Sequence, residues 1–133
     1  MTSVLLAEDD PFIRRVAEVS LQRAGFTVRT VGDGTEALAT LEQAPVDLVI
    51  LDGHMPAMDG LEACRRLKAD PRTTAIPVIM LTARTAASDR SEGLAAGAAG
   101  YITKPFDPIT LGAQVRRIVN GHSAGTSPDH DVA

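Results

Sequence analysis

The chain has 133 residues, a formal net charge of −4 and a hydrophobic content of 44%, which indicate one globular domain that needs no disulfide or structural metal to fold. A single cysteine, Cys64, excludes an internal disulfide and fits a reducing, cytoplasmic location. No apolar run approaches a membrane span, and the acidic balance argues against direct nucleic-acid binding by this domain.

Short apolar runs alternate with amphipathic segments from the start of the chain. Ser3–Ala7 is typical of a buried strand, and Asp10 followed by Pro11 predicts the start of a helix. Apolar positions then recur at helical spacing up to Ala24, and we expect Gly25 to end the helix.

The same alternation continues to the end of the domain. Further strands are predicted over residues 27–31, 47–51, 77–81 and 100–102, with a turn at 32–34. The remaining helices are predicted as one that ends before Pro45, one capped by Asp59, one over residues 86–96 and one that follows Asp107 and ends near Gly121.

Some polar segments are expected to lie outside the packed domain or on its surface. Residues 122–133 lack an apolar period and are predicted to be a disordered tail or linker remnant, which leaves residues 1–121 as the domain. Arginine pairs on the predicted helices are expected to face solvent, at positions 14/15, 65/66 and 116/117, and the last pair could also serve a partner surface.

Strict alternation of strand and helix predicts an α/β fold. We expect a single-domain, doubly wound (βα)5, flavodoxin-like architecture, with a five-stranded parallel sheet of order 2-1-3-4-5 and helices on both faces. In that order strands 1, 3, 4 and 5 are neighbours, and their carboxyl ends open on one crevice. Polar residues follow these four strands: Glu8 and Asp9, Asp52, Thr82 and Lys104.

Physical chemistry limits what this constellation can do. Three converging carboxylates repel one another unless a cation joins them, and Lys104 supplies only one positive charge. A small set of oxygen ligands with room for water favours Mg²⁺. A metal site beside a hydroxyl and an ammonium suits a phosphoryl group, with Thr82 as a hydrogen-bond donor and Asp52 as the nucleophile.

These residues resemble the receiver domains of two-component response regulators. The matching segments keep the order and spacing of that family over roughly residues 3–120: LLAEDDP (5–11), LDGHMPAMDG (51–60), LTAR (81–84) and YITKPF (101–106). The resemblance implies that residues 1–121 form a receiver domain, a phosphorylation-activated switch rather than an enzyme.

The resemblance also implies roles for the acidic residues. Asp52 would be the phosphoacceptor, modified by the phosphohistidine of a sensor histidine kinase or of a histidine phosphotransfer protein. Asp9 would bind Mg²⁺ directly together with Asp52 and the backbone carbonyl of His54, and Glu8 would act through water. Lys104 would pair with the phosphoryl oxygens.

Further residues would relay the phosphorylated state. Thr82 resembles the switch hydroxyl and Tyr101 the aromatic that turns inward with it, although Tyr101 is equally compatible with an ordinary half-buried strand residue. A downstream target, or a second copy in a homodimer, would bind the face formed by the fourth helix, fifth strand and fifth helix. His54 and Arg84 occupy positions that tune phosphoryl lifetime, and the Lys104–Pro105 bond is typically cis in the family.

Other classes of protein place an aspartate after a strand. A haloacid-dehalogenase-like phosphatase or hydrolase would also use Asp52 as a nucleophile, but such enzymes typically have a second aspartate where this chain has His54. A nucleotide-binding flavodoxin-like module would need a glycine-rich loop after the first strand, which is missing. A degenerate receiver used only for interaction would not need the intact constellation.

Overall fold

The structure is a computed structural model that describes residues 2–83 and 87–124. Its five strands form one parallel sheet in the order β2-β1-β3-β4-β5, which confirms the predicted architecture. The strands are β1 (Ser3–Ala7), β2 (Thr27–Val31), β3 (Leu48–Asp52), β4 (Val78–Ala83) and β5 (Gly100–Lys104), and the helices are α1 (Pro11–Arg23), α2 (Gly34–Gln43), α3 (Gly60–Ala69), α4 (Ala87–Ala95) and α5 (Leu111–Ala124).

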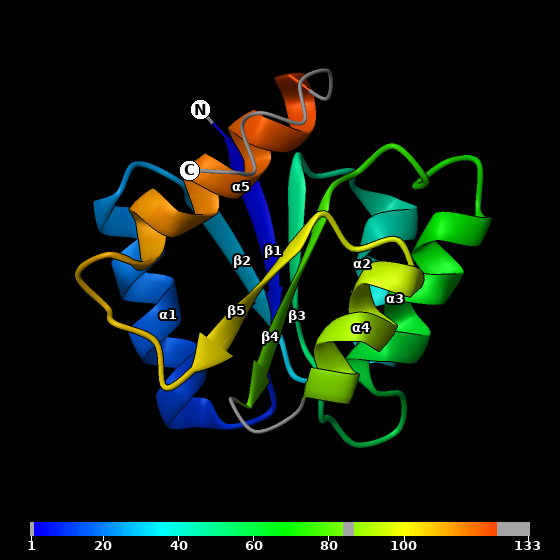
Figure 1. Cartoon of the computed structure of the whole chain (residues 1–133), viewed down its shortest axis with the longest axis horizontal. Helices are drawn as coiled ribbons and strands as arrows, with labels where there is room; N and C mark the ends of the chain where they lie inside the picture. The colour runs from blue at the N-terminus through cyan, green and yellow to red at the C-terminus, as the bar shows by residue number, and fades with distance from the viewer. Residues whose placement is uncertain (1, 84–86, 125–133) are drawn as a thin grey trace.

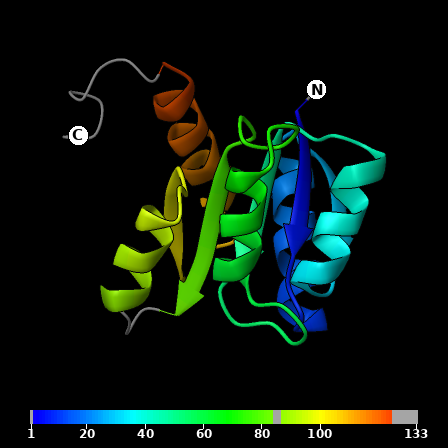
Figure 2. The ribbon, with the colours of Figure 1, turned by 90° about the vertical axis from the view of Figure 1, so that its right-hand side faces the viewer.

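Helices cover both faces of the sheet, α1 and α5 on one side and α2, α3 and α4 on the other (Figures 1 and 2). Because side chains alternate along a strand, each central strand contributes to two apolar layers. In β3, Val49 and Leu51 pack toward the three-helix side, and Leu48 and Ile50 pack toward α1 and α5. Every residue of β3 is buried, so this strand is a rigid support for the carboxylate at its end.

Local signals in the sequence determine several helix ends. The side chain of Asp10 accepts hydrogen bonds from the backbone nitrogens of Phe12 and Ile13, and Gly25 follows α1 with a φ of +100°. The side chain of Asp59 likewise caps α3 through the nitrogen of Glu62. None of the described helices is long and apolar enough to cross a membrane.

Other boundaries differ from the prediction. Helix α2 starts at Gly34 with Asp33 as its cap, inside the segment predicted as a turn. Helix α5 starts at Leu111, after a turn in which Asp107 accepts from the nitrogen of Ile109, and it extends past Gly121 to Ala124. Residues 84–86, where Arg84 and the start of the predicted fourth helix fall, and residues 125–133 of the expected tail lie outside the described residues.

The loop between β3 and α3 is packed tightly around the end of β3. The nitrogen of Gly53 donates to the carbonyl of Leu81 at 2.9 Å, and the nitrogen of Gly60 donates to the carbonyl of Gly53 at 3.3 Å. A Cβ atom at Gly60 would lie 2.1 Å from the carbonyl oxygen of Asp52. Only glycine therefore lets α3 begin this close to the end of β3.

We predict that Gly60→Ala lowers the free energy of unfolding by more than about 2 kcal/mol, because the methyl group forces the backbone away from Asp52. Gly121→Ala is the matched control, since a Cβ there has no atom of the described residues within 4 Å and alanine favours a helix. Urea unfolding of both variants checks this. Equal stability of Gly60→Ala and the parent would contradict the packing argument.

Candidate functional site

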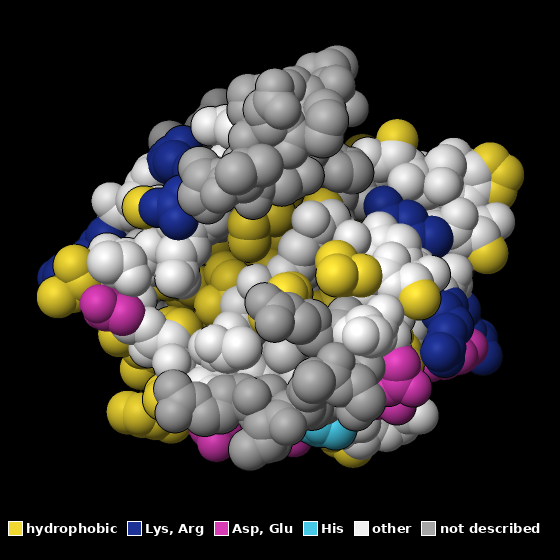
Figure 3. Space-filling model, in the orientation of Figure 1, with side chains coloured by type: hydrophobic (Ala, Val, Ile, Leu, Met, Phe, Trp, Pro, Cys, Tyr) yellow, Lys and Arg dark blue, Asp and Glu magenta, His cyan; other side chains and the backbone are white. Residues whose placement is uncertain are grey.

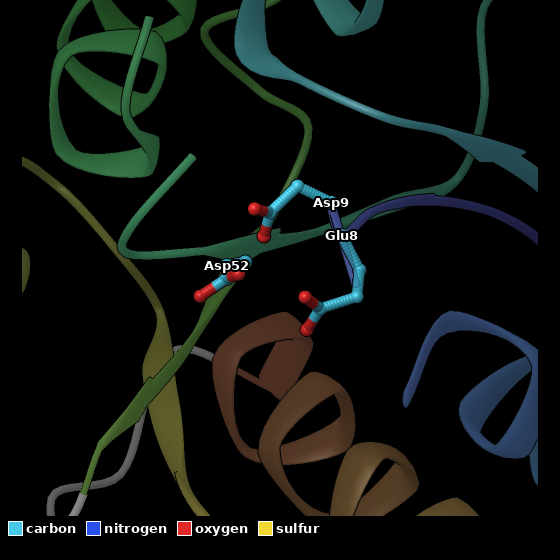
Figure 4. Close-up of side chains that lie close together, drawn as sticks. All are labelled: Glu8, Asp9 and Asp52. Carbon is cyan, nitrogen blue, oxygen red and sulfur yellow. The ribbon is translucent and has the colours of Figure 1, made fainter. Parts of the chain in front are cut away.

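Three carboxylates meet at the carboxyl ends of β1 and β3 (Figure 4). Glu8 and Asp9 follow β1 directly, and Asp52 is the last residue of β3. One ligand oxygen from each of the three lies within 4.8 Å of the others. The structure therefore brings together the three acids that the sequence placed on neighbouring strands.

Lys104 crosses from the end of β5 to two of these acids. Its Nζ atom lies 2.8 Å from Oε1 of Glu8 and 3.2 Å from Oδ1 of Asp52. Burial alone would lower the pKa of Lys104, but the contact with Glu8 and the charge of Asp52 outweigh burial and raise it. Lys104 is therefore a fixed positive charge, and it balances only one of the three carboxylates when all are ionised.

Glu8 is the most deeply placed acid, with none of its surface exposed. Burial is the largest cause that raises its pKa to about 7, while the Lys104 ammonium opposes this shift. Its Oε2 accepts a hydrogen bond from the nitrogen of Asp10 at 3.0 Å. Its Oε1 contacts Lys104 as an ion pair but accepts no well-aligned hydrogen bond from the described residues.

Asp52 is only 3% exposed, and its direction is fixed by its neighbours. Oδ1 accepts a hydrogen bond from the backbone nitrogen of His54 at 3.2 Å, in addition to the contact with Lys104. His54 itself is exposed, as expected for a loop residue. One carboxylate oxygen of Asp52 is thus held by the His54 nitrogen and the Lys104 ammonium. The neighbouring acid Asp9 is exposed, so the site is open to solvent on that side.

Thr82 lies on the neighbouring strand, one residue before the end of β4, and is buried. It lines a cavity of about 200 Å³ together with Gly53, His54, Met80 and Glu92 of α4. The cavity connects the end of β3 to α4. Thr82 at the end of β4 and Glu92 of α4 therefore face the same cavity.

Tyr101 does not lie at the strand ends with the other residues. It is half-buried near the start of β5, pairs in register with Met80 and packs against the apolar layer under α2, α3 and α4. The Lys104–Pro105 peptide bond at the other end of β5 is cis, as the resemblance implied.

Arg14 was predicted to lie on a solvated face, and this prediction is wrong. Its side chain is half-buried, and Nη1 donates to the backbone carbonyl of Glu8 at 2.9 Å. Helical periodicity placed Arg14 opposite the apolar stripe but gave no information about the strand end behind the first helical turn. Spacing in the sequence does not indicate this contact, because a long flexible side chain can leave the face that helical periodicity assigns to it.

The donor set fits a small divalent cation. All three groups offer carboxylate oxygens that lie within 4.8 Å of one another, and the single ammonium of Lys104 cannot balance three ionised carboxylates. Hard oxygen ligands of this kind favour Mg²⁺ over softer metals.

Comparison with known sequences identifies the family. The profile of the response regulator receiver domain matches residues 4–116. The chain belongs to this family. Receiver domains of two-component response regulators are signalling switches whose activity depends on phosphorylation, and the comparisons give no support to the haloacid-dehalogenase-like alternative.

Curated relatives of this receiver domain are longer proteins. It is 40% identical over 126 residues to the transcriptional regulatory protein CseB of Streptomyces coelicolor, covering 93% of this chain and 53% of the relative. It is also 40% identical over 119 residues to the DNA-binding regulator RpaA of Synechocystis, covering 90% of this chain and 49% of the relative. The chain spans about half the length of these relatives.

Solved structures of other receiver proteins share the fold over most of the length of both chains. The chemotaxis response regulator CheY4 of Vibrio cholerae matches with a TM-score of 0.83 at 38% identity, covering 89% of this chain and 98% of that one. The receiver domain of the sensor histidine kinase PA1611 of Pseudomonas aeruginosa matches with a TM-score of 0.81 at 33% identity, covering 90% and 98%. That structure has a magnesium ion coordinated in its active-site cleft.

The raised pKa of Glu8 predicts a pH dependence of stability when divalent cations are chelated. The folded state holds the Glu8 proton more tightly than the unfolded chain, whose ordinary value is 4.5, so this group stabilises the fold fully below pH 4.5. The stabilisation is lost as the pH rises through about 7. Glu8→Gln is expected to remove this fall in the free energy of unfolding, measured by urea titration between pH 5 and 8.

The matched control for this experiment is Glu62→Gln, because the Glu62 side chain is exposed and forms ion pairs with Arg65 and Arg66 on the surface of α3. It should keep the pH dependence of the parent. An unchanged slope in Glu8→Gln would contradict a protonation linked to folding at this position.

Proposed function

We propose that Asp52 accepts a phosphoryl group from the phosphohistidine of a sensor histidine kinase or a histidine phosphotransfer protein. An Asp52 carboxylate oxygen attacks the phosphorus, the nitrogen–phosphorus bond of the donor breaks, and the imidazole leaves with its electron pair. The product is an acyl phosphate. The observation that supports this most is the buried Asp52, held by Lys104 beside two further carboxylates at one sheet edge.

The remaining acids would hold Mg²⁺. We propose Asp9 and Asp52 as direct ligands with the backbone carbonyl of His54, and Glu8 as a ligand through water. Bound there, the cation would neutralise oxygens of the incoming phosphoryl group. The Lys104 ammonium would neutralise others, since it already lies 3.2 Å from Asp52. Burial of Glu8 and Asp52 strengthens each of these charge interactions, because little water screens them.

The proposed output is a conformational change on the face of α4, β5 and α5. Thr82 would donate its hydroxyl to a phosphoryl oxygen on Asp52, and the cavity it lines leads to α4. Tyr101 packs on the same side of the sheet. A shift of these two residues would favour one of two states of the face, and a target protein or a second copy would bind that state.

Surface features support this face as a binding surface. A groove of about 560 Å³ runs between β5 and α5, lined in part by Tyr101, Phe106 and Ile118. Hydrophobic side chains gather in the hollow beside β5 in Figure 3. Leu94 of α4 is 49% exposed. Large apolar groups that remain accessible near a proposed switch are typical of a partner surface.

We further propose that the only reaction of the domain is its own phosphorylation and dephosphorylation, in the cytoplasm. The net charge of −4 supports a domain that does not itself bind nucleic acid. The buried thiol of Cys64 is compatible with a reducing compartment. Relatives of about twice the length are named transcriptional regulators, which supports transcription as an output in proteins of this kind.

Incubation with Mg²⁺ and acetyl phosphate tests the acceptor. Intact mass spectrometry is expected to show one phosphoryl adduct that is stable in acid and labile in alkali, because an acyl phosphate has this chemistry. Asp52→Asn should abolish the adduct. Asp59→Asn, which changes an acid of the same loop whose side chain caps α3, should keep it. An adduct that persists in Asp52→Asn would refute the assignment.

The only tyrosine of a chain without tryptophan, Tyr101, offers a direct probe of the switch. We predict that phosphorylation changes the tyrosine fluorescence of the parent and of Thr103→Val, an exposed control on β5. The change should be lost in Thr82→Val phosphorylated to the same extent, since valine keeps the shape but removes the hydroxyl. The same change in Thr82→Val and the parent would exclude Thr82 as the relay.

A further inference from the structure

Arg14 makes a contact with the acidic site that its neighbour Arg15 does not make. From the first turn of α1 its Nη1 atom reaches the backbone carbonyl of Glu8 at 2.9 Å. Arg15 is exposed and pairs with Glu18 at 3.0 Å on the helix surface. Two adjacent arginines of the same helix therefore have different environments, one at the strand end and one in solvent.

The carbonyl that Arg14 binds belongs to the peptide unit joining the two acids. The nitrogen of Glu8 makes the last contact toward β2, donating to Val31 at 3.1 Å. Beyond it the chain turns, with the Glu8 side chain fully buried and Asp9 exposed. Because a peptide unit is planar, a hydrogen bond that fixes this carbonyl also restricts the directions in which both side chains leave the backbone.

The guanidinium also lies near the turn after β2. Nη1 lies 3.6 Å from the position that a Cβ of Gly32 would occupy, in the turn after β2. In that turn the nitrogen of Gly32 donates to Oε1 of Glu36 at 3.0 Å. The guanidinium of Arg14 therefore lies between the end of β1 and the turn after β2, with its hydrogen bond to the Glu8 carbonyl on the β1 side.

We propose that Arg14 is a positioning residue for the cation site: it holds the Glu8–Asp9 peptide so that both carboxylates converge with Asp52. The inference rests on the proposed Mg²⁺ site. Geometry and charge act in opposite directions here. Removing a positive charge near three carboxylates favours a cation, whereas releasing the Glu8 carbonyl lets the ligands move apart and weakens binding. A decrease in Mg²⁺ affinity on removal of Arg14 therefore indicates positioning, and an increase indicates that its charge dominates.

Magnesium titrations followed by ¹H–¹⁵N NMR of the backbone amides test the proposal. Arg14→Gln is expected to weaken Mg²⁺ binding about 10-fold, the scale for losing a group that orients a metal ligand. Arg14→Lys should be intermediate, because an ammonium can donate one hydrogen bond to the carbonyl. Arg15→Gln removes the same charge from an exposed position and should change the dissociation constant by less than about twofold.

A second readout separates positioning from general damage to the fold. The Mg²⁺ concentration for half-maximal labelling by acetyl phosphate should rise in Arg14→Gln, while the rate at saturating Mg²⁺ stays near that of the parent. Equal or tighter Mg²⁺ binding in Arg14→Gln, or a rate loss that saturating Mg²⁺ does not restore, would overturn the role of Arg14. Absence of Mg²⁺ binding by the parent would instead overturn the metal site and, with it, this proposal.

Discussion

Lys104 holds together two buried carboxylates that would otherwise repel each other, and the site depends on this contact. The ammonium reaches Glu8 on one strand end and Asp52 on another, yet Asp9 adds a third negative charge. One lysine therefore balances the site only in part. The remaining negative charge favours a divalent cation. With that cation bound, the acidic cluster would attract a phosphoryl group instead of repelling it.

The fold makes this contact possible through strand order and backbone packing. The strand order β2-β1-β3-β4-β5 places four strands side by side with their carboxyl ends at one edge of the sheet. These strands carry Glu8, Asp52, Thr82 and Lys104 at or directly after their ends. Apolar layers on both faces fix β3 in place, and Gly60 lets α3 begin against its last residue. The acidic edge of the sheet is thus held by a rigid core, and the loop after β3 adds the hydrogen bond from His54 to Asp52.

Much of this arrangement could be predicted from the sequence because it follows from the periodicity of apolar residues and from the residues that cap or end helices. Buried β-branched runs mark the strands, and Asp10 and Asp59 form the caps that their positions predict. Contacts that depend on the direction of a side chain could not be predicted. Arg14 has the spacing of a solvent-facing residue, yet its length lets it reach behind the first turn to Glu8. Periodicity describes which face a residue lies on, and a long flexible side chain can leave that face.

The central claim is that the Asp52 carboxylate itself becomes the acyl phosphate. Reduction of the phosphorylated protein with borohydride tests it directly, because an aspartyl phosphate is converted to homoserine while a free carboxylate is not. Peptide mapping by mass spectrometry should find homoserine at position 52 alone, dependent on Mg²⁺ and acetyl phosphate. Homoserine at position 9, a reduced glutamate at position 8, or an unreduced adduct elsewhere in the chain would contradict the account.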